Sequence, residues 1–203
     1  MKEEVRKLLE TTIHLFLRYG IRSVTMDDVA REMGISKKTI YQHFSDRSAL
    51  VDAAVGFHLG YMQEKCLEIF GQQENPIDQL LEVARFFHSI TRQMNPSLLL
   101  DLKKLFPTSW KRVNDHRTDF IEKQVLDNLQ RGIVMGLYRD DLNIEIVARL
   151  YIHLIELIID DELFPKVKYT YRELQKELVN YHIHGISTNK GIEYLKAKNT
   201  END

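Results

Sequence analysis

The chain has 203 residues and a formal net charge of −2, so it can bury a substantial core and is not a general binder of polyanions. Only 9 Gly and 4 Pro leave little material for a turn-rich fold of many strands. The single cysteine, Cys66, excludes an intramolecular disulfide and a cysteine-based zinc site, and suits a reducing cytoplasm.

The apolar stretches predict no membrane segment. Residues 147–159 are the most apolar, but they include Arg149, His153 and Glu156. Residues 1–10 are charged, so we expect no secretory signal and a cytoplasmic protein.

The first predicted helix ends at Gly20, and its apolar residues recur at helical spacing. These residues are Val5, Leu8, Leu9, Thr12, Ile13, Phe16 and Leu17. This amphipathic helix is expected to cover the next two helices, because a head of about 50 residues is close to the minimum for a core of its own.

A second helix is predicted to begin after Thr25, a favourable N-cap. Asp27 and Asp28 follow in its first turn, where negative charge complements the helix dipole. Gly34 is expected to end this helix, because glycine adopts the left-handed conformation at little cost.

A third, short helix is predicted for residues 37–44, capped by Ser36, with Ile40 and Phe44 on its apolar side. Asp46 is a candidate cap for a further helix that begins at residue 47 or 48. Two helices joined by a glycine-containing turn, with cations and amides on the second, indicate a DNA-binding helix-turn-helix.

Residues 5–54 resemble the N-terminal domain of the tetracycline-repressor (TetR) family of bacterial transcription regulators. The matching residues are Phe16, Tyr19, Gly20, Thr25, Val29, Ala30, Gly34, Ile35, Ser36, Thr39, Tyr41, His43, Phe44, Arg47 and Leu50. The sequence departs from the family at Arg47, where lysine is usual, and at Asp27, where some relatives carry a base-reading cation.

The resemblance implies two groups of DNA-binding residues. It implies contacts with base edges from Lys37, Lys38, Thr39 and Gln42. It implies contacts with phosphates from Thr25, Ser36, Tyr41, His43 and Arg47. The chemistry agrees, since an amide such as Gln42 pairs with adenine and a lysine with guanine.

The remainder of the chain also reads as helices, so the predicted class is all-α, with a three-helix head and a helical body. We expect a DNA-binding domain at residues 1–46, an effector-binding and dimerisation domain at 47–190, and a frayed tail at 191–203. Within the body, helices are predicted at about 47–70, 77–93, 98–105, 108–135, 144–163 and 170–187.

The helix predicted at 144–163 is apolar on more than one face, so we expect it to be buried all round, partly by a second subunit. Family members pair their last two helices in this way, which implies a homodimer through residues 144–163 and 170–187. A two-fold dimer presents two recognition helices to a palindromic operator in double-stranded DNA, about 34–36 Å apart or further.

A small-molecule effector is the third expected partner. Six aromatic or polarisable residues of the body are candidates for lining a pocket, although residues of this kind are more often ordinary core: Phe87, His88, Trp110, His116, Phe120 and Tyr151. The predicted function is a repressor that the effector releases from its operator. The alternative is an effector-binding or scaffold protein whose head no longer reads DNA.

Catalysis has no support in the sequence, and we expect no catalytic residue, cofactor or metal. No glycine-rich phosphate loop, nucleophile elbow or HExxH motif is present. His153 and Glu156 lie three residues apart, but a di-iron bundle needs two such motifs and further carboxylates. We expect this pair to be a buried histidine with its partner at the subunit interface.

Overall fold

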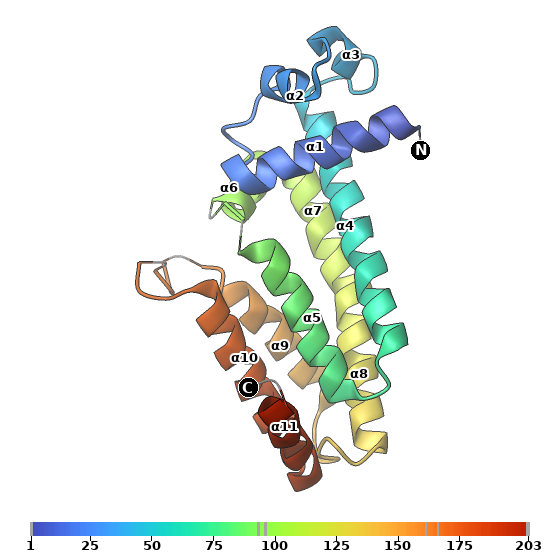
Figure 1. Cartoon of the computed structure of the whole chain (residues 1–203), viewed down its shortest axis with the longest axis vertical. Helices are drawn as coiled ribbons and strands as arrows, with labels where there is room; N and C mark the ends of the chain where they lie inside the picture. The colour runs from blue at the N-terminus through green and yellow to red at the C-terminus, as the bar shows by residue number, and fades with distance from the viewer. Residues whose placement is uncertain (1, 93, 96, 161, 166, 202–203) are drawn as a thin grey trace. The chain divides into compact units, whose positions relative to one another are not determined.

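The computed structural model describes residues 2–92, 94–95, 97–160, 162–165 and 167–201, with side chains to residue 198. Its described residues form helices and no strand, which confirms the all-α prediction (Figure 1). In chain order the elements are α1 (Glu3–Tyr19), α2 (Met26–Met33), α3 (Lys37–Tyr41), α4 (Arg47–Gln72), α5 (Pro76–Thr91), α6 (Leu98–Leu105), α7 (Pro107–His116), the π-helical turn η1 (Arg117–Ile121), α8 (Glu122–Val134), α9 (Ile144–Leu157), α10 (Tyr171–Ile186) and α11 (Asn189–Glu201).

The chain divides into two compact units. Unit 1 is Met1–Lys65 with Gln93–Arg117, and unit 2 is Cys66–Arg92 with Thr118–Asp203. Unit 1 therefore holds α1, α2, α3, α6, α7 and α4 as far as Lys65. Helices α6 and α7, which the sequence predicts to be part of the body, share a hydrophobic cluster with the three head helices.

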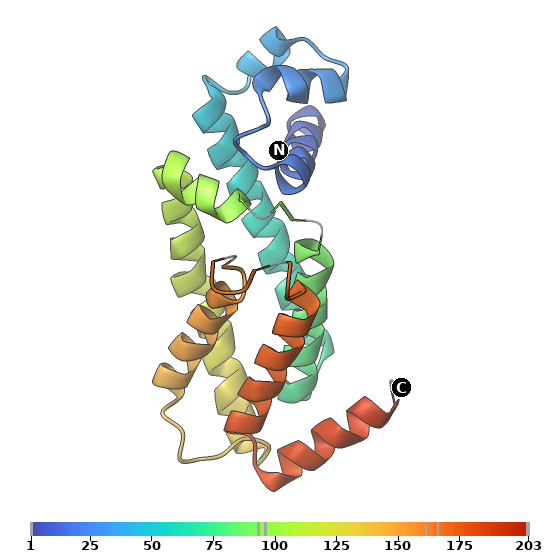
Figure 2. The ribbon, with the colours of Figure 1, turned by 90° about the vertical axis from the view of Figure 1, so that its left-hand side faces the viewer.

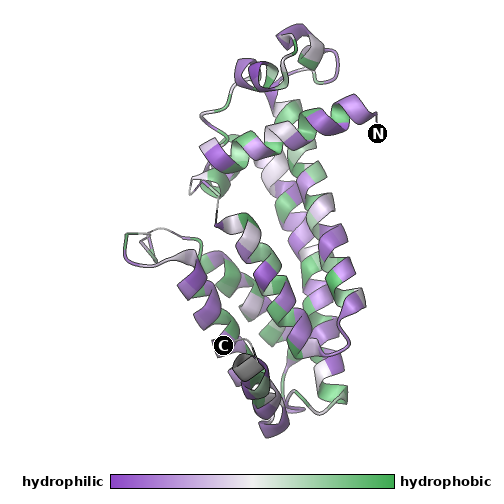
Figure 3. Cartoon of the chain, in the orientation of Figure 1, coloured by the Kyte–Doolittle hydropathy of each residue, from purple (hydrophilic) through white to green (hydrophobic). Residues whose placement is uncertain are grey.

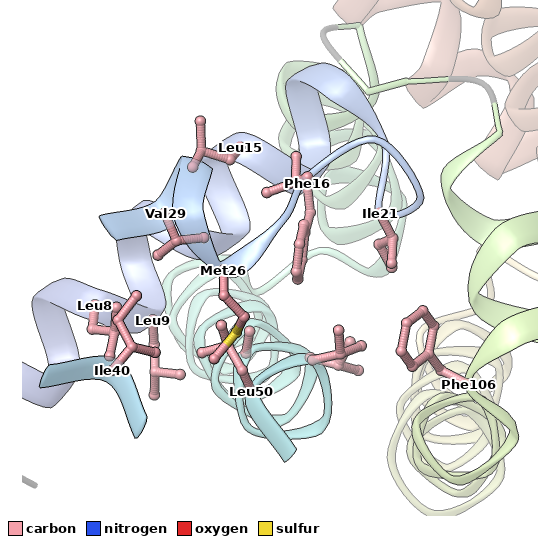
Figure 4. Packing of buried hydrophobic residues seen from close by; sticks show 14 of the residues in the cluster. Leu8, Leu9, Leu15, Phe16, Ile21, Met26, Val29, Ile40, Leu50 and Phe106 are labelled. Atoms are coloured by element: carbon pink, nitrogen blue, oxygen red, sulfur yellow. The ribbon is translucent and has the colours of Figure 1, made fainter. Parts of the chain in front are cut away.

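A single hydrophobic cluster holds unit 1 together (Figure 4). The apolar stripe of α1 faces α2 and the start of α4, and residues from the α1–α2 loop and from the α6–α7 junction complete the cluster. Buried members that Figure 4 labels are Leu8, Leu9, Leu15, Phe16, Ile21, Met26, Val29, Ile40, Leu50 and Phe106. The apolar side of the amphipathic helix α1 is thus buried against the other head helices, as predicted.

Most predicted helix boundaries agree with the structure to within a few residues, and α6 spans the predicted residues 98–105. The helix predicted at 108–135 is interrupted by η1 between α7 and α8. The helix predicted at 144–163 ends earlier, because α9 stops at Leu157. Residue 161 of that range lies outside the described residues.

Unit 2 is built around α5, α8, α9 and α10, which contact one another. A buried polar network joins α5 and α8: Asn128 Nδ2 donates to the Pro76 carbonyl (2.8 Å) and to Gln79 Oε1 (3.0 Å). Tyr138 donates its hydroxyl proton to Asn128 Oδ1 (3.2 Å), while Gln79 Nε2 reaches the carbonyls of Phe70 and Gln73. These buried amides are satisfied, so they specify packing at little cost.

The segment after Gly191 differs from the frayed tail that the sequence predicts. It is helical as far as Glu201 and turns away from the direction of α10 (Figure 2). Leu195 is buried in the core of unit 2, and Tyr194 donates a hydrogen bond to Asp78 on α5. These contacts order the segment despite its Lys- and Asn-rich composition. Residues 202–203 lie outside the described residues.

Most helices are hydrophobic on one side and hydrophilic on the other (Figure 3). In the described part of the chain, no helix is long and apolar enough to cross a membrane.

Candidate nucleic-acid interface

The helix α2 begins with a complete capping box. The Asp28 amide donates to Thr25 Oγ1 (3.2 Å), and the Thr25 amide and hydroxyl donate to Asp28 Oδ2 (2.9 and 2.6 Å). These hydrogen bonds hold the pKa of Asp28 below its usual value. Thr25, a predicted phosphate contact, therefore has its hydroxyl engaged in starting the helix.

Gly34 sets the angle between α2 and α3. It adopts a left-handed conformation (φ 65°), and its amide donates to the carbonyls of Ala30 and Arg31. The Ile35 amide also donates to the Ala30 carbonyl (3.0 Å), so backbone hydrogen bonds close the last turn of α2. Only glycine adopts this geometry readily, and the chain is directed at once into α3.

Helix α3 is short and is held at both ends. Ser36 Oγ accepts from the Thr39 amide (3.1 Å) and lies 2.9 Å from Thr39 Oγ1. The regular helix ends at Tyr41, three residues before the predicted end, and continues as a turn in which His43 and Phe44 donate to the Ile40 carbonyl. Because Ile40 is fully buried, the other sides of α3 remain available for contact.

The exposed surface of α3 gathers most of the predicted base-reading residues. Lys37, Lys38, Tyr41 and Gln42 are exposed, and Thr39 is half-buried beside the Ser36 cap. This surface combines two cations, a carboxamide and a phenol, the donor and acceptor types that read base edges and bind phosphates.

Two polar side-chain contacts on or beside this surface were not foreseen from the sequence. Lys37 Nζ donates to Asp27 Oδ2 at 2.7 Å, and this bond raises the pKa of Lys37. His43 Nε2, half-buried, lies 3.9 Å from a carboxylate oxygen of Glu4 on α1. The one sequence signal for the first pair is that Asp27 lies in the first turn of α2 and Lys37 is the first residue of α3.

Arg47 is placed differently from the other predicted phosphate contacts. Its guanidinium donates from Nε and Nη2 to the Val24 carbonyl (3.3 and 3.1 Å) and from Nη2 to the Ile21 carbonyl. The same group lies over the ring of Phe106. Arg47 therefore ties the α1–α2 loop to the start of α4, where Asp46 Oδ1 caps the helix by accepting from the Ala49 amide (2.8 Å).

The six candidate pocket residues are divided between the two units. Trp110 and His116 belong to unit 1, and the other four, Phe87, His88, Phe120 and Tyr151, belong to unit 2. Within unit 2, His88 on α5 stacks parallel to Tyr171 on α10, with 6.3 Å between ring centres. Tyr151 on α9 stacks on His182 of α10 at 3.8 Å.

The His153–Glu156 pair forms, with 3.1 Å between Nδ1 and Oε2, but it is not buried within this chain. His153 is exposed and Glu156 is half-buried, because the histidine lies on the face of α9 that points away from the core of unit 2. The described residues contain no group of three or more His, Cys, Asp or Glu able to hold a metal ion.

Comparison with known proteins agrees with this geometry. Residues 8–54, which include the whole helix-turn-helix, match the model of the family described as bacterial regulatory proteins, tetR family. An uncharacterised HTH-type transcriptional regulator of Bacillus subtilis, YvaF, is 25% identical over 91% of this chain and 96% of its own length. The HTH-type transcriptional repressor KstR2 of Mycobacterium tuberculosis is 25% identical over 70% of this chain and 73% of its own.

Solved structures share the fold along nearly the whole chain. A transcriptional regulator from Saccharomonospora viridis, determined in complex with choline, has a TM-score of 0.75 at 20% identity and covers 93% of this chain and 100% of its own. A regulator from Cytophaga hutchinsonii has a TM-score of 0.75 at 17% identity, covering 92% of this chain and 100% of its own. At these identities the likeness establishes the fold.

Proposed function

Because residues 8–54 match the TetR family of bacterial regulatory proteins, we propose that this chain is a homodimeric repressor of that family, which binds a palindromic operator through α3. The observation that carries the proposal is the exposed surface of α3. Its buried residue, Ile40, anchors the helix to the core of unit 1, while Lys38, Tyr41 and Gln42 are exposed.

In this proposal the residues of α3 have two roles. Lys37, Lys38, Thr39 and Gln42 meet base edges in the major groove, and Tyr41 and His43 contact phosphates. Thr25 would contact a phosphate only by exchanging the hydrogen bond that its hydroxyl donates to Asp28. Ser36 caps α3 as an acceptor, so its hydroxyl proton can be donated to a phosphate while the cap stays in place. Arg47 acts by positioning, because its guanidinium is already bonded to two carbonyls of the α1–α2 loop.

The proposed dimer uses the second apolar face of α9 with α10. One face of α9 is core, with Ala148, Tyr151 and Ile152 buried. Ile146 and Leu150, four residues apart on another face, are 57% and 60% exposed. An apolar stripe of this kind on a helix favours burial by a second copy, and two-fold pairing matches a palindromic site.

The proposed effector is a small molecule bound by the helices of unit 2. The buried Nδ1 of His88 has no hydrogen-bond partner among the described residues, and the ring stacks on Tyr171. A buried polar atom beside an aromatic ring suits a ligand with a complementary polar group. Effector binding would shift α4, change the spacing of the two heads and release the operator, which requires unequal affinity for the two states.

Selection of bound duplexes from a random DNA pool by the purified full-length protein tests this function. Enrichment of an inverted repeat is the expected result. A folded dimer that enriches no sequence, with or without added cell metabolites, would favour the alternative of a helical scaffold protein. An effector that leaves operator affinity unchanged would remove the release mechanism alone.

A further inference from the structure

The ion pair between Asp27 and Lys37 lies on the proposed DNA-facing surface. Asp27 is in the first turn of α2, and Lys37 is the first residue of α3. Lys37 Nζ lies 2.7 Å from Asp27 Oδ2, and the two side chains are 44% and 59% exposed. Asp28 is occupied with the Thr25 cap, so the two consecutive acids have separate tasks.

A carboxylate at this place is unexpected in a surface meant for DNA. Each lysine that neutralises a phosphate releases counterions and adds sequence-independent affinity. A carboxylate beside it repels the backbone and competes for the ammonium. Lys38, by contrast, has no ion pair in the part of the chain that the structure describes.

The pair also limits where the Lys37 ammonium can lie. A free lysine is a mobile point charge on a flexible stem. Here one of its three N–H groups is held by a residue of the preceding helix, which leaves two donors at the start of α3. A guanine offers two neighbouring acceptors, O6 and N7, in the major groove, and such geometry rewards a donor whose position is held.

We propose that Asp27 is a specificity-determining positioning residue, which holds Lys37 for base readout and withdraws it from indiscriminate phosphate binding. The inference rests on the proposed function of α3 in DNA binding. Asp27 acts through Lys37 and need not touch DNA itself.

The test is a double-mutant cycle measured on the full-length protein. Fluorescence anisotropy with the selected operator and with a scrambled duplex of equal length, between 50 and 200 mM salt, compares the wild type, Asp27→Asn, Lys37→Gln and the double variant. Glu32→Gln is the matched control, since it removes one exposed acid from the same helix. Asp27→Glu restores the charge and tests rescue.

Asp27→Asn is expected to bind the scrambled duplex more tightly and to steepen the dependence of log affinity on log salt by about one unit, as one added phosphate contact would. Its preference for the operator over the scrambled duplex should fall about fivefold or more. In the Lys37→Gln background, Asp27→Asn should change the affinity and the operator preference no more than Glu32→Gln does. Asp27→Glu should restore most of the preference.

The inference is overturned if Asp27→Asn has the same effect with and without Lys37, or only the effect of Glu32→Gln. Asp27 would then be an ordinary surface charge while α3 still reads DNA. A wild-type protein that does not distinguish the operator from the scrambled duplex removes the proposed function, and this inference with it.

Discussion

The guanidinium carbon of Arg47 lies 5.2 Å from the centre of the Phe106 ring, while the same group donates to the carbonyls of Ile21 and Val24. One side chain thus links the loop after α1, the start of α4 and the junction of α6 with α7. The planar guanidinium fork serves several acceptors while its face covers an aromatic ring. The ammonium of lysine, usual at this position in the family, cannot reproduce that arrangement.

Arg47→Ala is therefore expected to destabilise the protein by about 2 kcal/mol, because it removes charged hydrogen bonds and leaves two carbonyls short of a donor. Urea unfolding measures this loss. Arg22→Ala, at an exposed position in the same loop, should change stability by less than about 0.5 kcal/mol. Unchanged stability with weaker binding to all duplexes would instead support the direct phosphate contact that the resemblance implies.

Gln42→Ala should show whether Gln42 reads a single base pair or only adds general affinity for DNA. Loss of the Gln42 amide is expected to relax the preference at one base pair by about 1–3 kcal/mol. Competition binding with operators substituted one position at a time measures that preference. Gln73→Ala, a carboxamide removed outside the helix-turn-helix, serves as the control. Equal weakening on every sequence would contradict a base-reading role for Gln42.

Gly132→Ala should be among the most damaging small substitutions. A Cβ at this position would lie 1.9 Å from Cδ2 of the buried Tyr138 ring, which has no room to move. The expected loss of stability is about 3 kcal/mol. Gly60→Ala, on the exposed side of α4 with no neighbour within 4 Å, should be neutral or stabilising by about 0.5–1 kcal/mol. Thermal unfolding compares the two, and similar effects would contradict the packing described.

Leu150→Glu should disrupt the proposed dimer without unfolding the chain, because Leu150 is exposed on α9. Burying the added carboxylate against a partner copy would cost several kcal/mol. Sedimentation analysis is expected to show a shift toward monomer. Leu67→Glu, at an exposed leucine of α4, serves as the control and should sediment with the mass of a dimer. A Leu150→Glu protein that remains a dimer would exclude this face.

Acid should destabilise the protein partly through His182. Burial lowers the pKa of His182 to about 4, below its ordinary value of 6.5. Between these values the unfolded chain binds the proton and the folded chain does not, so stability falls as the pH drops from 6.5 toward 4. The contribution of this group reaches roughly 3 kcal/mol at the acid end.

Urea unfolding of the wild type and His182→Gln at several pH values isolates that contribution. The variant should lose less stability between pH 6.5 and 4.5 than the wild type. His58 has its pKa lowered to about 4 by burial as well, so part of the pH dependence remains in the variant. Identical pH profiles would contradict the lowered pKa, because His182 would then take up its proton as readily in the folded protein as in the unfolded chain.

Local signals made the helix-turn-helix predictable. Thr25, Gly34 and Ser36 act on backbone groups within four residues of themselves, and the structure has all three as helix caps. The same is true of Asp46, whose carboxylate caps α4. Interactions of this range depend on the neighbouring sequence alone, so the caps and the amphipathic stripe of α1 determined where the head helices begin and end.

Only the tertiary structure decided which distant residues meet. Lys37 donates to Asp27, ten positions away, and Arg47 donates to the carbonyl of Ile21, twenty-six positions away. Phe106 packs into the core of the head. Leu195 similarly orders a segment whose composition predicts fraying. Such contacts follow from packing angles and loop paths that no local pattern encodes. The proposed DNA-reading helix could therefore be identified from the sequence, while the partners of its charged side chains were set by the fold.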